Sequence, residues 1–383
     1  MKKKKQRRNP KPQNDDIISA LSDELLLHII SFLPAATAFA TSLLSHRWRH
    51  LWDNLLALYF HFHDGHHQID FIKLVNGVIS RRKQPNVRKL HLLSPSTTTV
   101  PIQNRIATWI DAILGPHLQE ISLTLSSPCF FPPCILRCES LVSLHLECRQ
   151  MHLENICNIY HLPSLKKLVL KLCAANSVMP LLSCCPNLET LELDFHHGII
   201  FFLNFGMLPS LKSLTLLGLG IRVYEIIINT PLLEYLNINI ESTKCITFSV
   251  TSNFQNLVRV HYNIVHLHHI KDVVNLLNKI YRAQRLTWNV SRLKKNKRAW
   301  KEPRIAPSCV ESHLKDVEFR GYCDSKQEHG FLGYILHRGH VLKKMKIMFH
   351  GLKKSPSVDI RKQQVQTLST LPRSSNTCQL LFD

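Results

Sequence analysis

The chain has 383 residues and little of what marks catalytic proteins. It contains only 12 glycines and no glycine-rich phosphate loop, and GxSxG, HExxH and CxxC motifs do not occur in it. We therefore predict a protein that is not an enzyme, with no catalytic residue and no cofactor.

Long apolar runs are also missing. The nearest candidate, Ile199 to Leu208, is interrupted by Asn204 and Gly206, and it is much shorter than the roughly 18 residues of a membrane helix. The basic start, Met1 to Arg8, lacks the apolar segment of a secretory signal. These two absences predict a soluble protein of the nucleus or the cytoplasm, without membrane association.

Disulfide and metal-ligand patterns are absent as well. None of the 12 cysteines forms a CxxC pair, and without a secretion signal we expect reduced thiols. Cys184 and Cys185 are adjacent, which permits a redox pair, but their place before a leucine-rich stretch favours packing in a core. Two groups of histidines have no cysteine near them, so we predict no metal site there: His61, His63, His66 and His67, and His261, His266, His268 and His269.

Positive charge is what the chain has in excess, with a formal net charge of +21. Seven basic residues lie within Lys2 to Lys11, and another seven lie between Arg292 and Arg304. The excess is therefore concentrated in a tail and a linker. The first run is either a nuclear import signal or a disordered solubilising tail. Net charge alone motivates a nucleic-acid-binding role, which is the less favoured alternative.

The strongest helical pattern lies between Asp16 and Trp52. Ser22 can cap a helix whose first turn carries Asp23 and Glu24, and Pro34 ends that helix. Apolar residues recur there at helical spacing, namely Leu25, Leu26, Ile29, Ile30 and Leu33, followed by Trp48, Leu51 and Trp52. About forty residues with so much apolar surface cannot bury all of it alone, which favours a partner that covers the remainder.

This stretch resembles a plant F-box, the module that docks on the Skp adaptor of a cullin-based ubiquitin ligase. Four pieces in the family's order carry the resemblance: Leu21–Leu26, Ile29–Pro34, Ala40–Ser45 and Arg47–Trp52. The family usually has an adaptor-contacting proline where this chain has Ser22, and a charged turn where it has Ala35–Ala38. The resemblance implies a set of adaptor-binding residues, some of which must fill the module's own core: Leu21, Leu25, Leu26, Ile29, Leu33, Leu44, Trp48 and Trp52.

A second pattern, apolar-x-x-apolar-x-apolar, repeats along the chain. Clear copies start at 141, 165, 188, 211, 233 and 257, which are 22 to 24 residues apart, and weaker copies start at Val87, Leu118, Ala283, Leu314 and Leu342. The fourth and sixth positions of each copy point to one face of a short strand, and stacked copies give a continuous core. The leucine spacing fits a helix poorly, so a solenoid is favoured over a set of amphipathic helices. The pattern resembles the irregular leucine-rich repeat that accompanies F-boxes in plants.

Two further segments, Cys309–Tyr322 and Gly330–Ile347, resemble the FBD domain found behind such repeats. We therefore predict an α/β chain in which a small helical F-box precedes a leucine-rich-repeat solenoid with an FBD-like extension. The predicted parts are a basic disordered tail (1–13), the F-box (14–55), a connecting segment (56–86), the solenoid (87–290), a basic linker (291–308), the FBD-like region (309–350) and a loose polar tail (351–383).

Residues that alternate with the core positions should share the concave face of the solenoid, one strand about 4.8 Å from the next. Lys171 should lie there between Glu147 and Asp194. The face carries charges of both signs and one aromatic ring, which suits a protein segment better than a phosphate backbone. The predicted target-binding residues are His145, Glu147, Lys167, Lys171, Glu192, Asp194, Tyr235, Asn237, Arg259 and His261.

Together these predictions describe a substrate-recognition adapter of an SCF-type (Skp–cullin–F-box) ubiquitin ligase. The F-box would bind a Skp-type adaptor and through it a cullin, while the repeats would bind an unidentified target protein. An alternative from the same residues is a protein-binding scaffold whose degenerate F-box no longer binds the adaptor.

Overall fold

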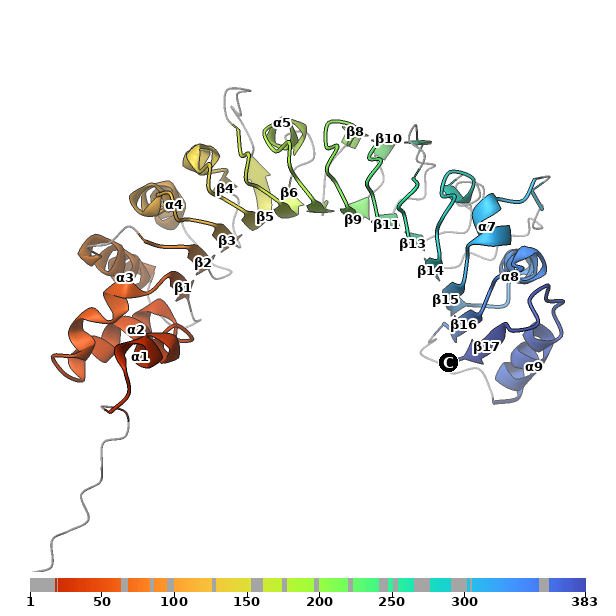
Figure 1. Cartoon of the computed structure of the whole chain (residues 1–383), viewed down its shortest axis with the longest axis horizontal. Helices are drawn as coiled ribbons and strands as arrows, with labels where there is room; N and C mark the ends of the chain where they lie inside the picture. The colour runs from red at the N-terminus through yellow and green to blue at the C-terminus, as the bar shows by residue number, and fades with distance from the viewer. Residues whose placement is uncertain are drawn as a thin grey trace, which may run out of the picture.

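The chain forms a curved solenoid of parallel strands with a small helical module at its N-terminal end (Figure 1). A computed structural model describes residues 18, 20–62, 68–82, 86–94, 100–125, 129–152, 161–173, 178–195, 200–219, 223–240, 247–250, 254–264, 276–290, 302–303, 305–350 and 358–383. Within these residues, no helix is both long enough and apolar enough to cross a bilayer.

The N-terminal module consists of short helices. They are α1 (Asp23–Ile30), α2 (Ala35–Ala40) and the 3₁₀ turns η1 (Thr41–Leu43), η2 (Trp48–His50) and η3 (Trp52–Asn54). This part confirms the predicted helical unit that opens the chain.

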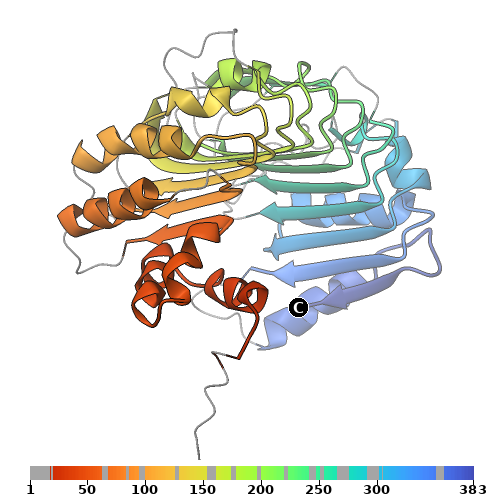
Figure 2. The ribbon, with the colours of Figure 1, turned by 60° about the vertical axis from the view of Figure 1, so that its left-hand side comes forward.

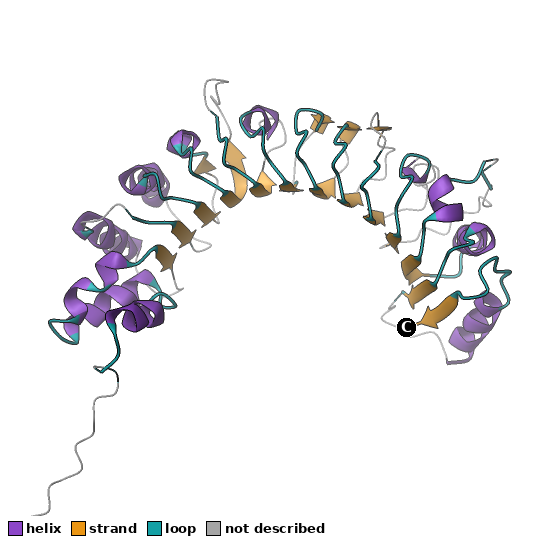
Figure 3. Ribbon diagram, viewed as in Figure 1, coloured by secondary structure: helices purple, strands orange, loops and turns teal. Residues whose placement is uncertain are grey.

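One large sheet lines the concave side of the solenoid (Figure 3). Its main path follows chain order, every pairing in it is parallel, and the short strand β4 (Cys129–Phe130) pairs with β5 beside that path. The strands are β1 (Ala57–His61), β2 (Lys89–Leu93), β3 (Glu120–Leu125), β5 (Ser143–His152), β6 (Lys167–Cys173), β7 (Thr190–Asp194), β9 (Ser213–Leu219), β11 (Tyr235–Ile240), β13 (Arg259–Ile264), β14 (Arg285–Val290), β15 (Asp316–Tyr322), β16 (Lys344–Phe349) and β17 (Gln379–Phe382).

The convex side carries helices and a second sheet (Figures 2 and 3). The helical segments are α3 (Gln68–Arg81), α4 (Val100–Ile113), η4 (Pro133–Arg137), α5 (Val178–Ser183), α7 (Ser308–Ser312), α8 (Lys326–Arg338) and α9 (Val358–Ser369). In the central repeats, three parallel strands take the place of helices: β8 (Ile200–Asn204), β10 (Val223–Ile228) and β12 (Thr247–Val250).

The repeat pattern accounts for the core. In the first clear copy, Leu141, Leu144 and Leu146 are all fully buried, while Ser143 and His145 between them face the concave side. The same alternation recurs in the following copies, except at Val169, which is buried between Leu168 and Leu170. The weaker copies also lead into strands of the large sheet, from Val87, Leu118, Ala283, Leu314 and Leu342. The predicted solenoid is confirmed, and the alternative of amphipathic helices is wrong.

The sheet extends beyond the predicted solenoid limits at both ends. Because β1 pairs with β2, the predicted connecting segment already contributes a strand. At the other end β15 and β16 continue the stack through the FBD-like region.

The prediction of a loose polar tail after 351 is wrong for the described part of that tail. α9 and β17 form a further repeat, in which β17 pairs with β16. Their apolar residues, including the buried Leu368 and the partly buried Leu380, cover the end of a core that β16 would otherwise leave open to solvent.

The helical module packs on the first strand and helix of the solenoid. Within the module, the Phe39 ring lies edge-on to Trp52 at 4.9 Å. The Arg81 guanidinium of α3 lies 5.4 Å from the centre of the same ring and joins the module to the solenoid. Arg82 also donates a hydrogen bond of 2.7 Å from Nη2 to the carbonyl oxygen of Leu55. The module therefore covers the open edge of β1, much as a terminal capping repeat does.

Two glycines with positive φ mark irregularities in the strand pairing. Gly218 has a φ of 63° and Gly321 a φ of 84°, and the pairing shifts register beside each of them. A Cβ at Gly321 would overlap the carbonyl oxygen of Val290 on the neighbouring strand. Only glycine fits such a bulge without strain.

Replacing Gly321 with alanine should therefore lower the free energy of unfolding by about 2 kcal/mol or more. The matched control is Gly77→Ala in α3, where a Cβ would meet nothing within 4 Å and alanine favours the helix, so stability should rise slightly. Urea unfolding followed by circular dichroism measures both. Equal stability of the two variants would contradict the role assigned to the bulge.

Candidate functional site

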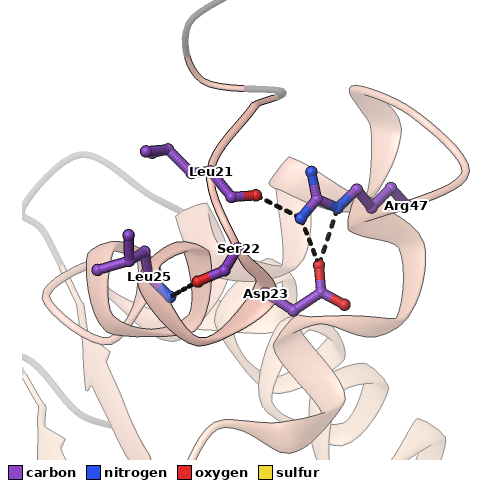
Figure 4. A network of polar contacts seen from close by, with 5 residues as sticks. All are labelled: Leu21, Ser22, Asp23, Leu25 and Arg47. Carbon is purple, nitrogen blue, oxygen red and sulfur yellow. Dashed lines mark hydrogen bonds and ion pairs between the residues drawn. The ribbon is translucent and has the colours of Figure 1, made fainter.

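The start of α1 is fixed by a side-chain cap and an arginine clamp (Figure 4). Ser22 accepts a hydrogen bond from the backbone N–H of Leu25 at 3.4 Å, and Asp23 follows on the first turn. Arg47 Nε donates a hydrogen bond to Asp23 Oδ1 at 2.8 Å, and Arg47 Nη2 donates one to the Leu21 carbonyl oxygen at 2.5 Å. The clamp joins the segment after η1 to the start of α1 across 24 residues of sequence.

Ser22 stands where the F-box family usually has proline, and its backbone suits either residue. Its φ is −67° and its ψ is 158°, which matches the φ that a proline ring imposes. The departure at Ser22 therefore changes the side chain offered to a partner without changing the path of the chain.

Three of the eight residues assigned to adaptor binding lie in the module's own core. Leu26 is completely buried, and Trp48 and Trp52 are nearly so. The indole Nε1 of Trp52 donates to the Arg49 carbonyl oxygen at 3.0 Å. In this conformation these side chains hold the module together, as expected of the part of the set that fills the module's own core. The contact of the set with an adaptor stays a prediction.

The other five residues reach the surface to different degrees. Leu25, Ile29 and Leu44 are 51%, 46% and 68% exposed, whereas Leu21 and Leu33 are partly buried against the core. Leu25 and Ile29 lie one turn apart on one face of α1. These residues make up the accessible share of the predicted surface.

Phe32 and Leu43 are further exposed apolar residues of the module, although the sequence did not lead us to assign them to adaptor binding. They are 74% and 86% exposed, more than any of the predicted residues. Phe32 continues the spacing of Leu25 and Ile29 by three residues, a signal that was present in the sequence. We call Leu25, Ile29, Phe32, Leu43 and Leu44 the apolar patch. So much exposed apolar side chain in a small module indicates an interaction surface.

The division between core and surface gives a stability test. Leu26→Ala should cost about 2–5 kcal/mol of unfolding free energy, because it opens a cavity in the module. The substitution of the neighbouring residue, Leu25→Ala, should change the free energy of unfolding by less than about 0.5 kcal/mol. Thermal unfolding followed by tryptophan fluorescence, to which Trp48 and Trp52 of the module contribute, measures both variants. A larger loss for Leu25→Ala than for Leu26→Ala would contradict the division.

The concave face has the cross-strand pairs that the repeat predicted. Lys171 lies between Glu147 and Asp194 in the register, with its Nζ 4.0 Å from Glu147 Oε2. The remaining predicted residues of this face also pair in order, with His145 opposite Val169, Lys167 opposite Thr190, Glu192 opposite Thr215, Tyr235 opposite Arg259 and Asn237 opposite His261. Their contact with a target stays a prediction.

Aromatic and cationic side chains meet at one point of this face. The Arg259 guanidinium lies 5.9 Å from the centre of the Tyr235 ring, and His261 lies 5.4 Å from the same ring. Contacts of this kind hold the ring in place on the sheet, ready to contact a partner.

Histidines on the concave face have lowered pKa values. Burial lowers the pKa of His91, His145 and His261, and nearby cations (Lys89, Lys171 and Arg320, respectively) lower it further. The ordinary pKa of histidine is about 6.5. Below that pH the unfolded chain binds more protons than the folded chain, so these three residues make the fold less stable as the pH falls.

Replacing all three with asparagine should therefore flatten the dependence of the melting temperature on pH between about 7.5 and 5.5. A control triple variant, Thr190→Asn, Thr215→Asn, Thr287→Asn, changes non-ionisable residues of the same concave strands and should keep the wild-type dependence. Differential scanning fluorimetry across this range measures both. A steeper pH dependence in the concave-face variant would contradict the assigned direction.

Cysteine and histidine chemistry does not define a site in the described part of the chain. Cys184 and Cys185 are unpaired and buried, as packing predicts, and burial raises the pKa of Cys185 to about 12. Within the described ranges, no group of three or more His, Cys, Asp or Glu side chains could hold a metal ion. Of the histidines weighed as ligands, His63, His66, His67, His266, His268 and His269 lie outside the described residues.

Family comparisons match three segments of the chain. The F-box domain matches residues 18–57, the FBD matches residues 302–347, and the leucine-rich repeats of FBD-associated F-box protein At5g56370 match residues 106–253. The F-box/LRR-repeat protein At3g26922 of Arabidopsis thaliana is 31% identical over 242 residues, covering 61% of this chain and 78% of that protein. The chain belongs to the F-box/FBD/leucine-rich-repeat family.

Similarity to this family extends along nearly the whole chain. FBD-associated F-box protein At3g52670 of Arabidopsis thaliana is 27% identical over 429 residues, covering 98% of this chain and 99% of that protein. The F-box/FBD/LRR-repeat protein At4g26340 of the same plant is 26% identical, covering 96% and 100%. The FBD match ends within β16, so α9 and β17 lie beyond the segment that it covers.

Proposed function

We propose that the chain is the non-catalytic substrate-recognition subunit of an SCF-type ubiquitin ligase. The F-box binds a Skp-type adaptor and through it a cullin, and the concave face of the repeats binds a target protein. The observation that carries this proposal is the apolar patch, which lies outside the repeats on a module whose buried side chains join the core of the solenoid.

The mechanism is proximity rather than chemistry. Holding a target near a charged ubiquitin carrier raises the effective concentration of the two reactants. The F-box packs against β1 and α3, so the adaptor and the target are held on one continuous scaffold. We expect this protein in the nucleus, the cytoplasm or both.

A scaffold with a degenerate F-box is the second candidate. Ser22 in place of the family's proline, and Ala35–Ala38 in place of a charged turn, favour it because both depart from the family's pattern within this module. The exposure of Phe32 and Leu43 supports the ligase role instead. Burying an apolar side chain of this size against a partner contributes roughly 1.5–3 kcal/mol of favourable free energy.

Capture on an immobilised Skp-type adaptor tests the proposal. The wild-type chain should be captured, and Ile29→Asp should weaken binding by about 30-fold or more, because it places a charge among the exposed apolar side chains of the patch. The matched control is Ile360→Asp in α9, whose side chain is 47% exposed against 46% for Ile29. This control should bind like the wild type.

Two results would count against the ligase role. Absence of wild-type capture would favour the degenerate F-box. Equal loss in Ile29→Asp and Ile360→Asp would show that binding does not depend on the apolar patch.

A further inference from the structure

The residue directly before each strand of the large sheet lies on one rim of the solenoid. In the middle repeats this rim alternates in charge, with Lys166, Glu189, Lys212 and Glu234 on successive strands. Glu189 lies 3.3 Å from Lys166 and 2.9 Å from Lys212, measured between the charged atoms. Here the side chains neutralise one another, as expected of a rim that faces only solvent.

The same rim changes character at β13 to β16. Lys315 and Lys343 occupy the position before β15 and β16, and the backbone N–H of Lys343 donates to the Lys315 carbonyl oxygen. The first residues of these four strands are cross-strand partners of one another, in the order Arg259, Arg285, Asp316 and Lys344. We call Arg259, Arg285, Lys315, Lys343 and Lys344 the basic rim.

Few acidic groups compensate the basic rim. Arg285 Nε lies 3.1 Å from Asp316 Oδ2, whereas Lys315 Nζ lies 3.3 Å from the neutral Oε1 of Gln284. Lys343 and Lys344 are exposed and form no ion pair with any residue that the structure describes.

Like charges on neighbouring strands repel each other and lower stability. The middle repeats avoid this cost at equivalent positions, so the basic rim is not a requirement of the fold. It resembles one half of a complementary charged interface, which lacks its anionic partner in the isolated chain.

The surroundings of the basic rim favour a protein segment over a nucleic acid. The large aromatic rings of β13 to β15, namely Tyr262, Trp288 and Phe319, point into the core and cannot stack on bases. Tyr235 of β11, which lies against Arg259, is a single half-buried ring and not a row of stacking platforms. Asn263, Thr287 and Asn289 lie on the adjoining concave face, where their side chains can hydrogen-bond a peptide backbone. Four strands span about 14 Å, the length of roughly four residues of extended chain.

We propose that the basic rim binds an extended segment of the target that is rich in Asp and Glu. This inference rests on the proposed function for its biological use, because it names the kind of target segment that the repeats accept. The binding itself requires neither the adaptor nor the cullin.

Fluorescence anisotropy of a labelled hexaglutamate peptide with the full chain tests this inference. The triple variant Lys315→Gln, Lys343→Gln, Lys344→Gln should bind about tenfold more weakly than the wild type, and wild-type binding should weaken as salt is raised. The matched control, Lys2→Gln, Lys3→Gln, Lys4→Gln, removes the same charge from the N-terminal run and should bind like the wild type. Equal affinity of the two triple variants would overturn the proposal.

A labelled hexauridylate RNA provides the competing probe. Tighter binding of this RNA than of hexaglutamate, lost in the same triple variant, would overturn the proposal in favour of a nucleic-acid site. Adaptor capture distinguishes failure of this inference from failure of the ligase role, because the basic-rim variant keeps the apolar patch. Peptide binding at the rim without adaptor capture would overturn the ligase role alone.

Discussion

Parallel pairing between consecutive repeats is the constraint on which the rest of the structure depends. Each repeat offers a short strand with two inward leucines, such as Leu144 and Leu146, and it cannot bury them without a neighbour on either side. The first and last strands lack one neighbour. The F-box covers β1, while α9 and β17 extend the stack beyond β16, so both ends of the core are protected. The F-box is therefore part of the fold as well as a candidate binding module.

The F-box divides its apolar residues between the core and the surface within a few residues of sequence. On α1, Leu26 and Ile30 point into the core while Leu25 and Ile29 point outward. The Arg47 clamp fixes the start of this helix relative to the turn that carries Leu43 and Leu44. A rigid helix with an apolar outer face suits a partner that supplies a complementary groove.

Much of the fold follows from the sequence because the repeat has two clear periods. The 22–24-residue spacing predicts the stack, and the alternation within a copy such as Leu141–Leu146 predicts which residues share the concave face and which pair across strands. Other features leave weaker signals. The last repeat lies outside the regular spacing, since the first residue of β17 comes 35 residues after the first residue of β16. The division of the predicted F-box residues into core and surface depends on tertiary packing, which the sequence pattern does not specify. The charge pattern of the rim appears only once the strands are aligned.

In the proposed arrangement, the F-box end of this solenoid binds an adaptor while the concave face stays free for another partner. Hydrogen–deuterium exchange of the full chain, with and without a Skp-type adaptor, distinguishes the two surfaces. We expect slower exchange of backbone amides in α1 and η1 when the adaptor is present, and unchanged exchange in the concave strands β5 to β14. Protection of those concave strands, with no change in α1 and η1, would contradict this arrangement.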